Sequence, residues 1–212
     1  MNSSPAPTKR STPDRLMDVA QAMFVKNGYH GVAVDKIIAQ TGVSKGTFFY
    51  HFKSKEDLAL RLLERYFERI AAAANAIGTA AAQQSDHPRQ ILDICLTEFE
   101  NLFNGRHVQG GADESLDGCL MAAFSYQLFN DIPSLRAISA QAINRFSTAY
   151  APLFDEVLAT ANSPVGISGE TLSKHYFALM QGTLLVSRID PAWTDFKQQI
   201  DSFKKMLNAL LK

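Results

Sequence analysis

Apolar residues recur at intervals of three and four along most of this chain, which is the spacing of one face of an α-helix. Near the N-terminus the pattern predicts three short helices, over residues 12–28, 34–41 and 45–51. Thr12 and Pro13 suit the start of the first helix, and Gly28 and Gly42 suit the ends of the first and the second. Ser44 is placed to cap the third helix. Two helices followed by a glycine-containing turn and another helix form the helix-turn-helix arrangement.

The rest of the chain continues with the helical period. We expect a long helix over 54–82 and further helices over 88–103, 118–130, 133–161, 168–189 and 191–211. Residues 104–117 carry glycines and charges without periodicity, so we expect a loop that is long enough to act as a gate. The sequence shows neither sustained alternation nor an Asn-Gly or Asp-Gly hairpin turn. The pattern therefore predicts an all-α protein.

Composition is that of a globular protein, with 46% apolar and 20% charged residues among 212. No uncharged apolar run reaches the length of about 18 residues that a membrane span needs, so none is expected. The first residues lack the apolar segment of a signal peptide and suggest a disordered tail over 1–12. Cys95 and Cys119 have no metal-type spacing. A reduced, cytoplasmic protein is the simplest interpretation.

The net charge of zero conceals an asymmetry. Residues 1–55 contain eight Lys and Arg against three Asp, so they carry a charge of +5 and the remainder carries −5. A basic N-terminal segment concentrates a phosphate-attracting field at one end of the molecule. Halves of any protein can differ by a few charges, so charge alone decides little.

Residues 41–56, TGVSKGTFFYHFKSKE, are the most informative segment. They place small, donor-rich side chains at the start of a very short helix and lysines around its end. This layout suits a helix that enters the major groove of DNA. The segment predicts double-stranded DNA as the partner.

The N-terminal segment strongly resembles the tetracycline-repressor (TetR) family of transcriptional regulators. The resemblance lies in LMDVAQAMFVKNGYHGVAVDKII (16–38) and AQTGVSKGTFFYHFKSKEDL (39–58). The remainder is similar in helix layout and in GCLMA (118–122). The resemblance implies a helix-turn-helix DNA-binding domain over 13–55 and a helical ligand-binding and dimerisation domain over 56–212. The implied protein is a repressor that a small, largely apolar effector releases from its operator.

The family pattern also implies which residues contact DNA: Lys45, Gly46, Thr47, Phe49, Tyr50, His51 and Lys55. The first three would face base edges at the start of the recognition helix. Tyr50 and His51 would contact phosphates near its end, and Lys55 would reach a phosphate with the help of the next helix dipole. Phe48 and Phe52 are expected to anchor the short helix to the core.

Two departures from the family pattern bear on the operator. The family often has tyrosine where Phe49 stands, so only an apolar contact with a thymine methyl remains there. Residues 32–34, Val-Ala-Val, lack the usual threonine or serine, which removes a helix cap and a phosphate contact.

The C-terminal segment carries an apolar seam at heptad spacing: Trp193, Phe196, Ile200, Phe203, Leu207 and Leu210. The preceding helix places Ala178, Gly182 and Leu185 along one side. Two such helices from each of two subunits would form a four-helix interface. We therefore expect a homodimer whose interface includes Ala178, Gly182, Leu185, Phe196, Ile200, Phe203 and Leu207. The alternative is that the seam packs inside one chain.

An aromatic and methionine-rich set in the helical domain is the candidate effector pocket implied by the resemblance: Phe99, Phe103, Met121, Phe124, Tyr126, Phe146, Tyr150, Tyr176, Phe177 and Met180. For any one of these residues, close-packed core is the alternative. Such pockets are mostly apolar with a few polar groups for orientation. The polar candidates are Tyr126, Gln127, Asn144, Tyr150, His175 and Gln181.

Two other functions stay open. Cys119 could be the thiol of a redox- or electrophile-sensing repressor, in which case Cys119→Ser would abolish the response without weakening operator binding. The alternative for Cys119 is a buried structural cysteine. Alternatively the chain is a helical dimeric binding protein with a vestigial head. The scattered histidines predict no metal site, and no cofactor is expected. No catalytic motif stands out, so we predict that the protein is not an enzyme.

Overall fold

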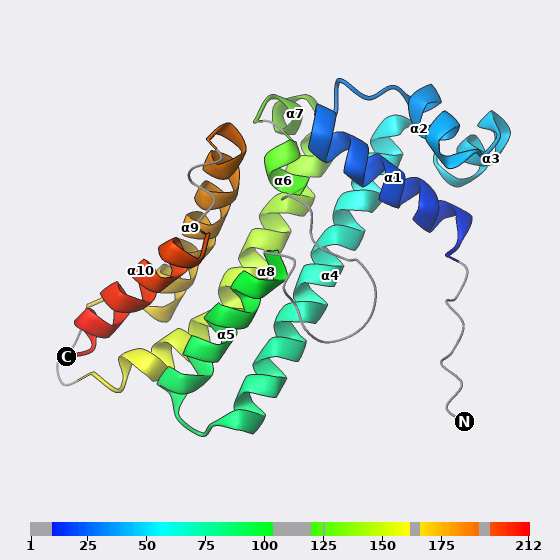
Figure 1. The fold of residues 1–212 in the computed structure, drawn as a ribbon. Helices are drawn as coiled ribbons and strands as arrows, with labels where there is room; N and C mark the ends of the chain where they lie inside the picture. Colours follow the sequence, from blue (N-terminus) through cyan, green and yellow to red (C-terminus); the bar gives the residue numbers. More distant parts are fainter. Residues whose placement is uncertain (1–9, 104–119, 125, 162–165, 191–195) are drawn as a thin grey trace, which may run out of the picture.

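The computed structural model describes residues 10–103, 120–124, 126–161, 166–190 and 196–212 (Figure 1). Within these ranges all the regular elements are α-helices, so the all-α prediction is confirmed. The first five are α1 (Thr12–Asn27), α2 (Val34–Thr41), α3 (Lys45–His51), α4 (Lys55–Gln84) and α5 (Pro88–Phe103). The others are α6 (Leu120–Ala123), α7 (Tyr126–Asp131), α8 (Pro133–Leu158), α9 (Gly169–Ile189) and α10 (Phe196–Leu210).

Local chemistry sets the ends of the three N-terminal helices, which we call the head. Ser11, and not Thr12 as expected, caps α1, because its hydroxyl accepts a hydrogen bond from the Asp14 amide at 3.3 Å. Gly28 (φ +70°) and Gly42 (φ +69°) end α1 and α2 in the positive-φ region that favours glycine. Ala33 precedes α2 without a side-chain cap, as the sequence predicts.

The remaining helices, α4 to α10, form what we call the body. The single helix expected over 118–130 is divided into the short helices α6 and α7. Helix α8 continues through Pro152, although proline removes one backbone hydrogen bond. The loop expected over 104–117 and Trp193 lie outside the described residues.

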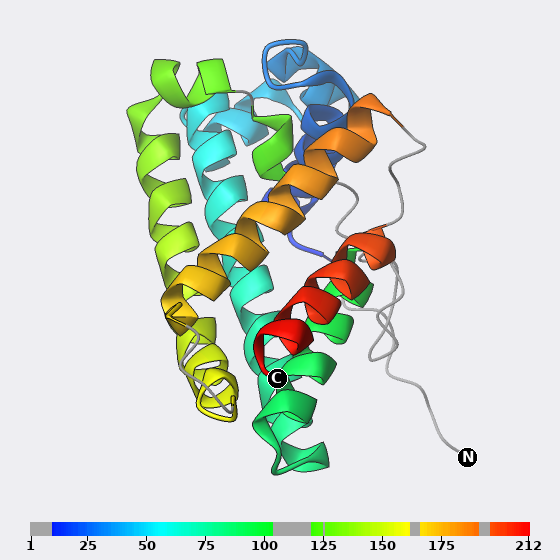
Figure 2. The ribbon, with the colours of Figure 1, turned by 90° about the vertical axis from the view of Figure 1, so that its left-hand side faces the viewer.

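The head sits at one end of the body, where α4 begins (Figure 1). Helices α4 and α5 form a long antiparallel pair, and α9 crosses the body obliquely against α8 (Figure 2). Helix α10 packs on α5 and α9. In the described part of the chain, no helix is both long and apolar enough to span a membrane.

The heptad seam of α10 lies inside the single chain, which corrects part of the predicted dimer interface. Phe196, Ile200, Phe203 and Leu207 are buried, with exposed fractions of 0–6%. The Phe203 ring lies 5.5 Å from the Tyr176 ring on α9, measured between centroids. The α5–α9 surface thus already covers the apolar stripe. Ala178, Gly182 and Leu185 on α9 are exposed and stay available to a second subunit.

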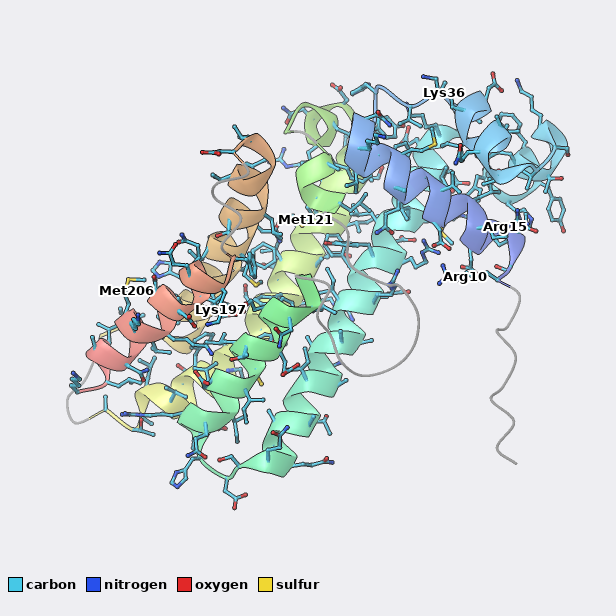
Figure 3. The ribbon with its side chains drawn as sticks, in the orientation of Figure 1. Arg10, Arg15, Lys36, Met121, Lys197 and Met206 are labelled. Carbon is cyan, nitrogen blue, oxygen red and sulfur yellow. The ribbon has the colours of Figure 1, made fainter. Side chains whose placement is uncertain are left out.

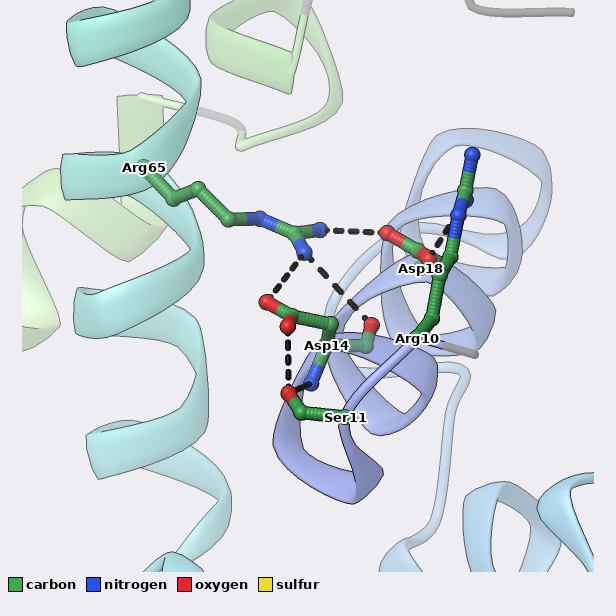
Figure 4. A network of polar contacts seen from close by, with 5 residues as sticks. All are labelled: Arg10, Ser11, Asp14, Asp18 and Arg65. Atoms are coloured by element: carbon green, nitrogen blue, oxygen red, sulfur yellow. Dashed lines mark hydrogen bonds and ion pairs between the residues drawn. The ribbon is translucent and has the colours of Figure 1, made fainter. Parts of the chain in front are cut away.

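A polar network joins the head to the body (Figure 4). Arg65 of α4 donates to Asp18 of α1 at 2.7 Å and lies 3.5 Å from a carboxylate oxygen of Asp14. Arg10 pairs with the other Asp18 oxygen at 2.8 Å. The Arg65 side chain is only 20% exposed. It therefore links α1 to α4 in a partly dry environment, where ion pairs are screened less than at the surface.

An aromatic cluster makes a second joint. Phe124, which follows α6, lies 6.0 Å from Phe24 and 6.1 Å from Tyr29, measured between ring centroids. Phe24 and Phe124 are buried. The end of α1 therefore packs directly on the segment that contains α6.

We predict that Arg65→Met lowers the free energy of unfolding by about 1 kcal/mol, because it leaves Asp14 and Asp18 with poorer hydrogen bonding. Chemical denaturation measures the change. Arg61→Met is the matched control, since Arg61 is on the same helix and also forms an ion pair, with Asp57. The Arg61 side chain is 52% exposed, so its pair is closer to solvent. That control should cost less than about 0.5 kcal/mol. Equal effects of the two variants would contradict the proposed joint.

Candidate nucleic-acid interface and body cavity

Helix α3 is short and needs support from its own cap and from two buried rings. The Ser44 hydroxyl accepts from the Thr47 amide at 3.0 Å and lies 2.8 Å from the Thr47 hydroxyl. Phe48 is fully buried and Phe52 is 1% exposed, as expected for the anchors of this helix. The rest of α3 can therefore face outward without loosening it.

The outward face of α3 carries most of the residues predicted to contact DNA. Tyr50 is 84% exposed and Phe49 is 47% exposed, which are large values for aromatic side chains. Lys45 and Gly46 are exposed, and a Cβ at Gly46 would meet no atom of this chain closer than 3.7 Å. Packing within the protein does not explain these residues.

Lys45 is not fully free in this structure. Its ammonium nitrogen lies 3.2 Å from a carboxylate oxygen of Asp35 on α2. The side chains are 67% and 77% exposed, so the pair is weak and can be exchanged for a stronger acceptor. Figure 3 labels two further cationic residues of the head, Arg15 and Lys36. Arg15 donates to the Thr41 carbonyl at 2.8 Å, which ties α1 to the end of α2.

Lys55 begins α4, and its ammonium nitrogen lies 4.1 Å from the centroid of the Tyr29 ring. That distance is typical of a cation–π contact. Partial burial lowers the pKa of Lys55 from its usual value. Burial of Tyr29 raises the pKa of its hydroxyl, and the negative charge of Glu56 raises this pKa further by a smaller amount. Tyr29 in turn packs edge-on against Phe124, so Lys55 is positioned by a contact that reaches the body.

The body encloses a cavity of about 380 Å³ between α4, α5, α8 and α9, with Met121 of α6 in its wall. Figure 3 labels Met121 beside α6. Six residues of the predicted pocket line this cavity: Phe99, Met121, Phe146, Tyr150, Phe177 and Met180. The volume is in the range of small-molecule sites.

Two other predicted pocket residues have different positions. Phe124 packs on the head, as described above. Tyr176 is fully buried behind the cavity wall, where its ring stacks at 6.2 Å from Phe146 and its hydroxyl lies 3.5 Å from the Leu96 carbonyl oxygen. The side chains of Phe103 and Tyr126 lie outside the described set, as does Cys119.

Most of the polar lining was not predicted. Tyr150 and Gln181 were among the polar candidates, whereas Glu64, Glu68, Asn75, Gln141 and Arg145 were not. All five are exposed surface positions of α4 and α8. In sequence they read as the solvated face of two amphipathic helices, so no local signal separated them from other charged positions.

The described cysteine, Cys95, is buried, and burial raises its pKa to about 11. It is therefore a neutral thiol near pH 7 and a poor nucleophile. In the described segments, no three His, Cys, Asp or Glu side chains are grouped so that they could hold a metal ion.

The cap and helices of the head define a helix-turn-helix protein. Residues 16–62 match the family model described as bacterial regulatory proteins, tetR family. Over the head, this chain therefore matches the tetR family. The relatives carry the names of regulators and not of enzymes, in agreement with the prediction that this chain is not an enzyme.

Two curated relatives match over only part of this chain. The chain is 42% identical over 50 residues to the HTH-type transcriptional regulator QacR of Staphylococcus aureus, covering 24% of this chain and 27% of the relative. It is 36% identical over 87 residues to the fatty acid metabolism regulator protein of Bacillus subtilis, covering 37% and 45%. The matches thus span less than half of these relatives. A longer match, 25% identical over 84% of both chains, is to the HTH-type transcriptional repressor DhaR of a Mycobacterium species.

Solved structures show the same fold over almost the whole chain. The regulatory protein TetR from Rhodobacter sphaeroides superposes with a TM-score of 0.70 at 20% identity, covering 94% of this chain and 98% of that one. The reduced form of NemR from E. coli gives 0.70 at 16% identity, covering 92% and 96%.

We predict that Ser44→Ala lowers stability by about 1 kcal/mol, because α3 loses its cap. Urea unfolding followed by circular dichroism measures the loss. Ser44→Asp keeps an oxygen acceptor at the cap, so it should restore stability and yet weaken binding to a DNA duplex through charge repulsion. If Ser44→Ala unfolded like the parent protein, the cap would not support this helix.

Proposed function

We propose that this protein is a homodimeric, cytoplasmic transcriptional regulator that binds an operator through α3. The observation that carries this proposal is the exposed surface of Lys45, Phe49 and Tyr50 on a helix held by buried Phe48, with Lys55 beside it. Each subunit places α3 in the major groove of one operator half-site. Lys45, Gly46 and Thr47 face base edges, and Tyr50, His51 and Lys55 face phosphates.

The second subunit packs on the α8–α9 face in this proposal. Helix α9 exposes Ala178, Gly182, Leu185 and Ile189 at successive turns. Leu185 is 48% and Ile189 is 77% exposed, which is unusual for large apolar side chains on a face without a partner. Small residues at Ala178 and Gly182 allow two helices to approach closely. The dimer therefore uses α9 and not the seam of α10.

The protein acts as a repressor that an effector in the body cavity releases from DNA. The long relative DhaR carries the name of a repressor, which favours this direction of control. Met121 lines the cavity, and Phe124, three residues later, packs on Tyr29 beneath Lys55. A ligand that favours another position of α6 therefore shifts the head and its phosphate contact. By linkage, operator DNA weakens effector binding by the same factor.

The salt dependence of DNA binding tests the proposed surface. Purified protein should bind a duplex containing the promoter region of its own gene, with affinity that falls steeply as salt rises. Lys55→Gln should reduce the slope of log K against log salt by about 0.9, the value for one phosphate contact. Lys174→Gln on α9 is the matched control and should leave the slope unchanged. A chain with a vestigial head would show no salt-dependent binding and no effect of Lys55→Gln.

A second prediction concerns Tyr29. Tyr29→Leu removes the ring under Lys55 and should weaken duplex binding by about three-fold, which is the scale of an exposed cation–π contact. Tyr29→Phe retains the ring and should bind like the parent protein. Competition binding with labelled duplex distinguishes the two variants. Equal losses would instead assign the effect to the Tyr29 hydroxyl.

A further inference from the structure

The cavity wall is aromatic in its depth and charged at its opening. Phe99 and Met180 are 1% exposed and Tyr150 is 6% exposed, so this part of the wall is dry. Among the described residues, the charged side chains that line the cavity are all exposed: Glu64, Glu68 and Arg145. A ligand in this cavity therefore meets rings inside and charges at the mouth.

Four of the rings come from three helices and face one another closely. Phe146 of α8 lies 4.7 Å from Tyr150, 5.2 Å from Phe177 of α9 and 5.6 Å from Phe99 of α5, between ring centroids. The π faces of such rings attract cations, most strongly where water is excluded. The wall is thus rich in aromatic rings.

Tyr150 adds an independent sign of a ligand. Its hydroxyl is buried and has no hydrogen-bond partner in the described protein. A buried polar group without a partner is costly, and native proteins rarely leave one unsatisfied. Burial also raises the pKa of Tyr150, so the group is a neutral phenol, whose oxygen can accept a hydrogen bond.

The two carboxylates at the mouth are not neutralised by their neighbours. Glu64 and Glu68 are one helical turn apart on α4, a spacing at which like charges repel. Two of the three arginines of α4 form ion pairs elsewhere, Arg61 with Asp57 and Arg65 with Asp14 and Asp18. The third, Arg69, directly follows Glu68 in the chain. Among the described side chains, no cation forms an ion pair with Glu64 or Glu68, Arg145 included.

The charge of the mouth favours one sign of ligand. Arg145 of α8 lines the same cavity as the two carboxylates of α4, so the three charged lining residues of the described chain have a summed formal charge of −1. Both carboxylates lie on one helix and act on the same part of the mouth, whereas a single guanidinium of α8 offsets only one of them. The aromatic wall and this negative edge attract the same kind of molecule.

We propose that the cavity takes an organic cation, with its apolar body against the rings of Phe99, Phe146 and Tyr150 and its positive nitrogen close to Glu64 and Glu68. This inference rests on the proposed function only in identifying the cavity as the effector site. Binding itself does not require DNA. Glu64 and Glu68 are the residues that select the charge of the ligand.

Three probes that share one ring system and differ in charge test the inference. They are (2-naphthylmethyl)trimethylammonium, its neutral tert-butyl isostere 2-neopentylnaphthalene, and 2-naphthylacetate. Calorimetric titration into the full chain without DNA should give tighter binding of the cation than of either other probe, by about tenfold over the neutral isostere. Glu64→Gln with Glu68→Gln should remove that preference.

The matched variants keep the shape of the site while they change its charge. Arg145→Gln should strengthen binding of the cation, the opposite of the double glutamine variant. Both changes are at exposed positions, and thermal melting verifies that each variant is folded. Tightest binding of 2-naphthylacetate, an unchanged preference in the double variant, or no binding of any probe would overturn the inference.

Failure of the inference and failure of the proposed function give different results. If the cation binds in the predicted way but does not release a DNA duplex, the ligand class stands and the effector-release mechanism falls. If the protein binds duplex DNA with the predicted salt slope but prefers the neutral or anionic probe, the regulator stands and the organic-cation inference falls.

Discussion

The structure depends on one constraint, the continuity of α4. This helix of 30 residues begins at the head with Lys55 and forms one wall of the body cavity with Glu64 and Glu68. A continuous helix transmits a tilt along its whole length, because its backbone hydrogen bonds resist bending between turns. Any event that moves its middle therefore also moves its first turn.

Two joints hold the head on α4 and have different physical character. The Arg65 network is polar and depends on charge, so salt and solvent weaken it. The cluster of Phe24, Tyr29 and Phe124 is apolar and depends on close packing, which does not deform continuously. Together they give the head a defined orientation, which the body can change through α4 or through α6.

Most of the head could be predicted from sequence because its signals are local. Ser44, Gly42 and the buried Phe48 each determine a cap, a turn or an anchor within a few residues. The prediction was wrong by one residue at the first cap, where Ser11 replaces Thr12, since both hydroxyls precede the same helix. The cavity was predicted only in part. Its aromatic residues stood out, whereas its charged mouth looked like ordinary helix surface.

The sequence by itself determined the helical period, the helix-turn-helix and the exposed lysine and tyrosine positions of α3, because hydrophobic spacing, caps and glycine conformation act over short distances. Only the tertiary structure decided where the apolar seam of α10 is buried and which rings face one another. It alone brought Glu64 and Glu68 into the wall of a cavity. These outcomes depend on contacts between residues that are distant in the chain, and periodicity shows that a face is apolar without showing what covers it.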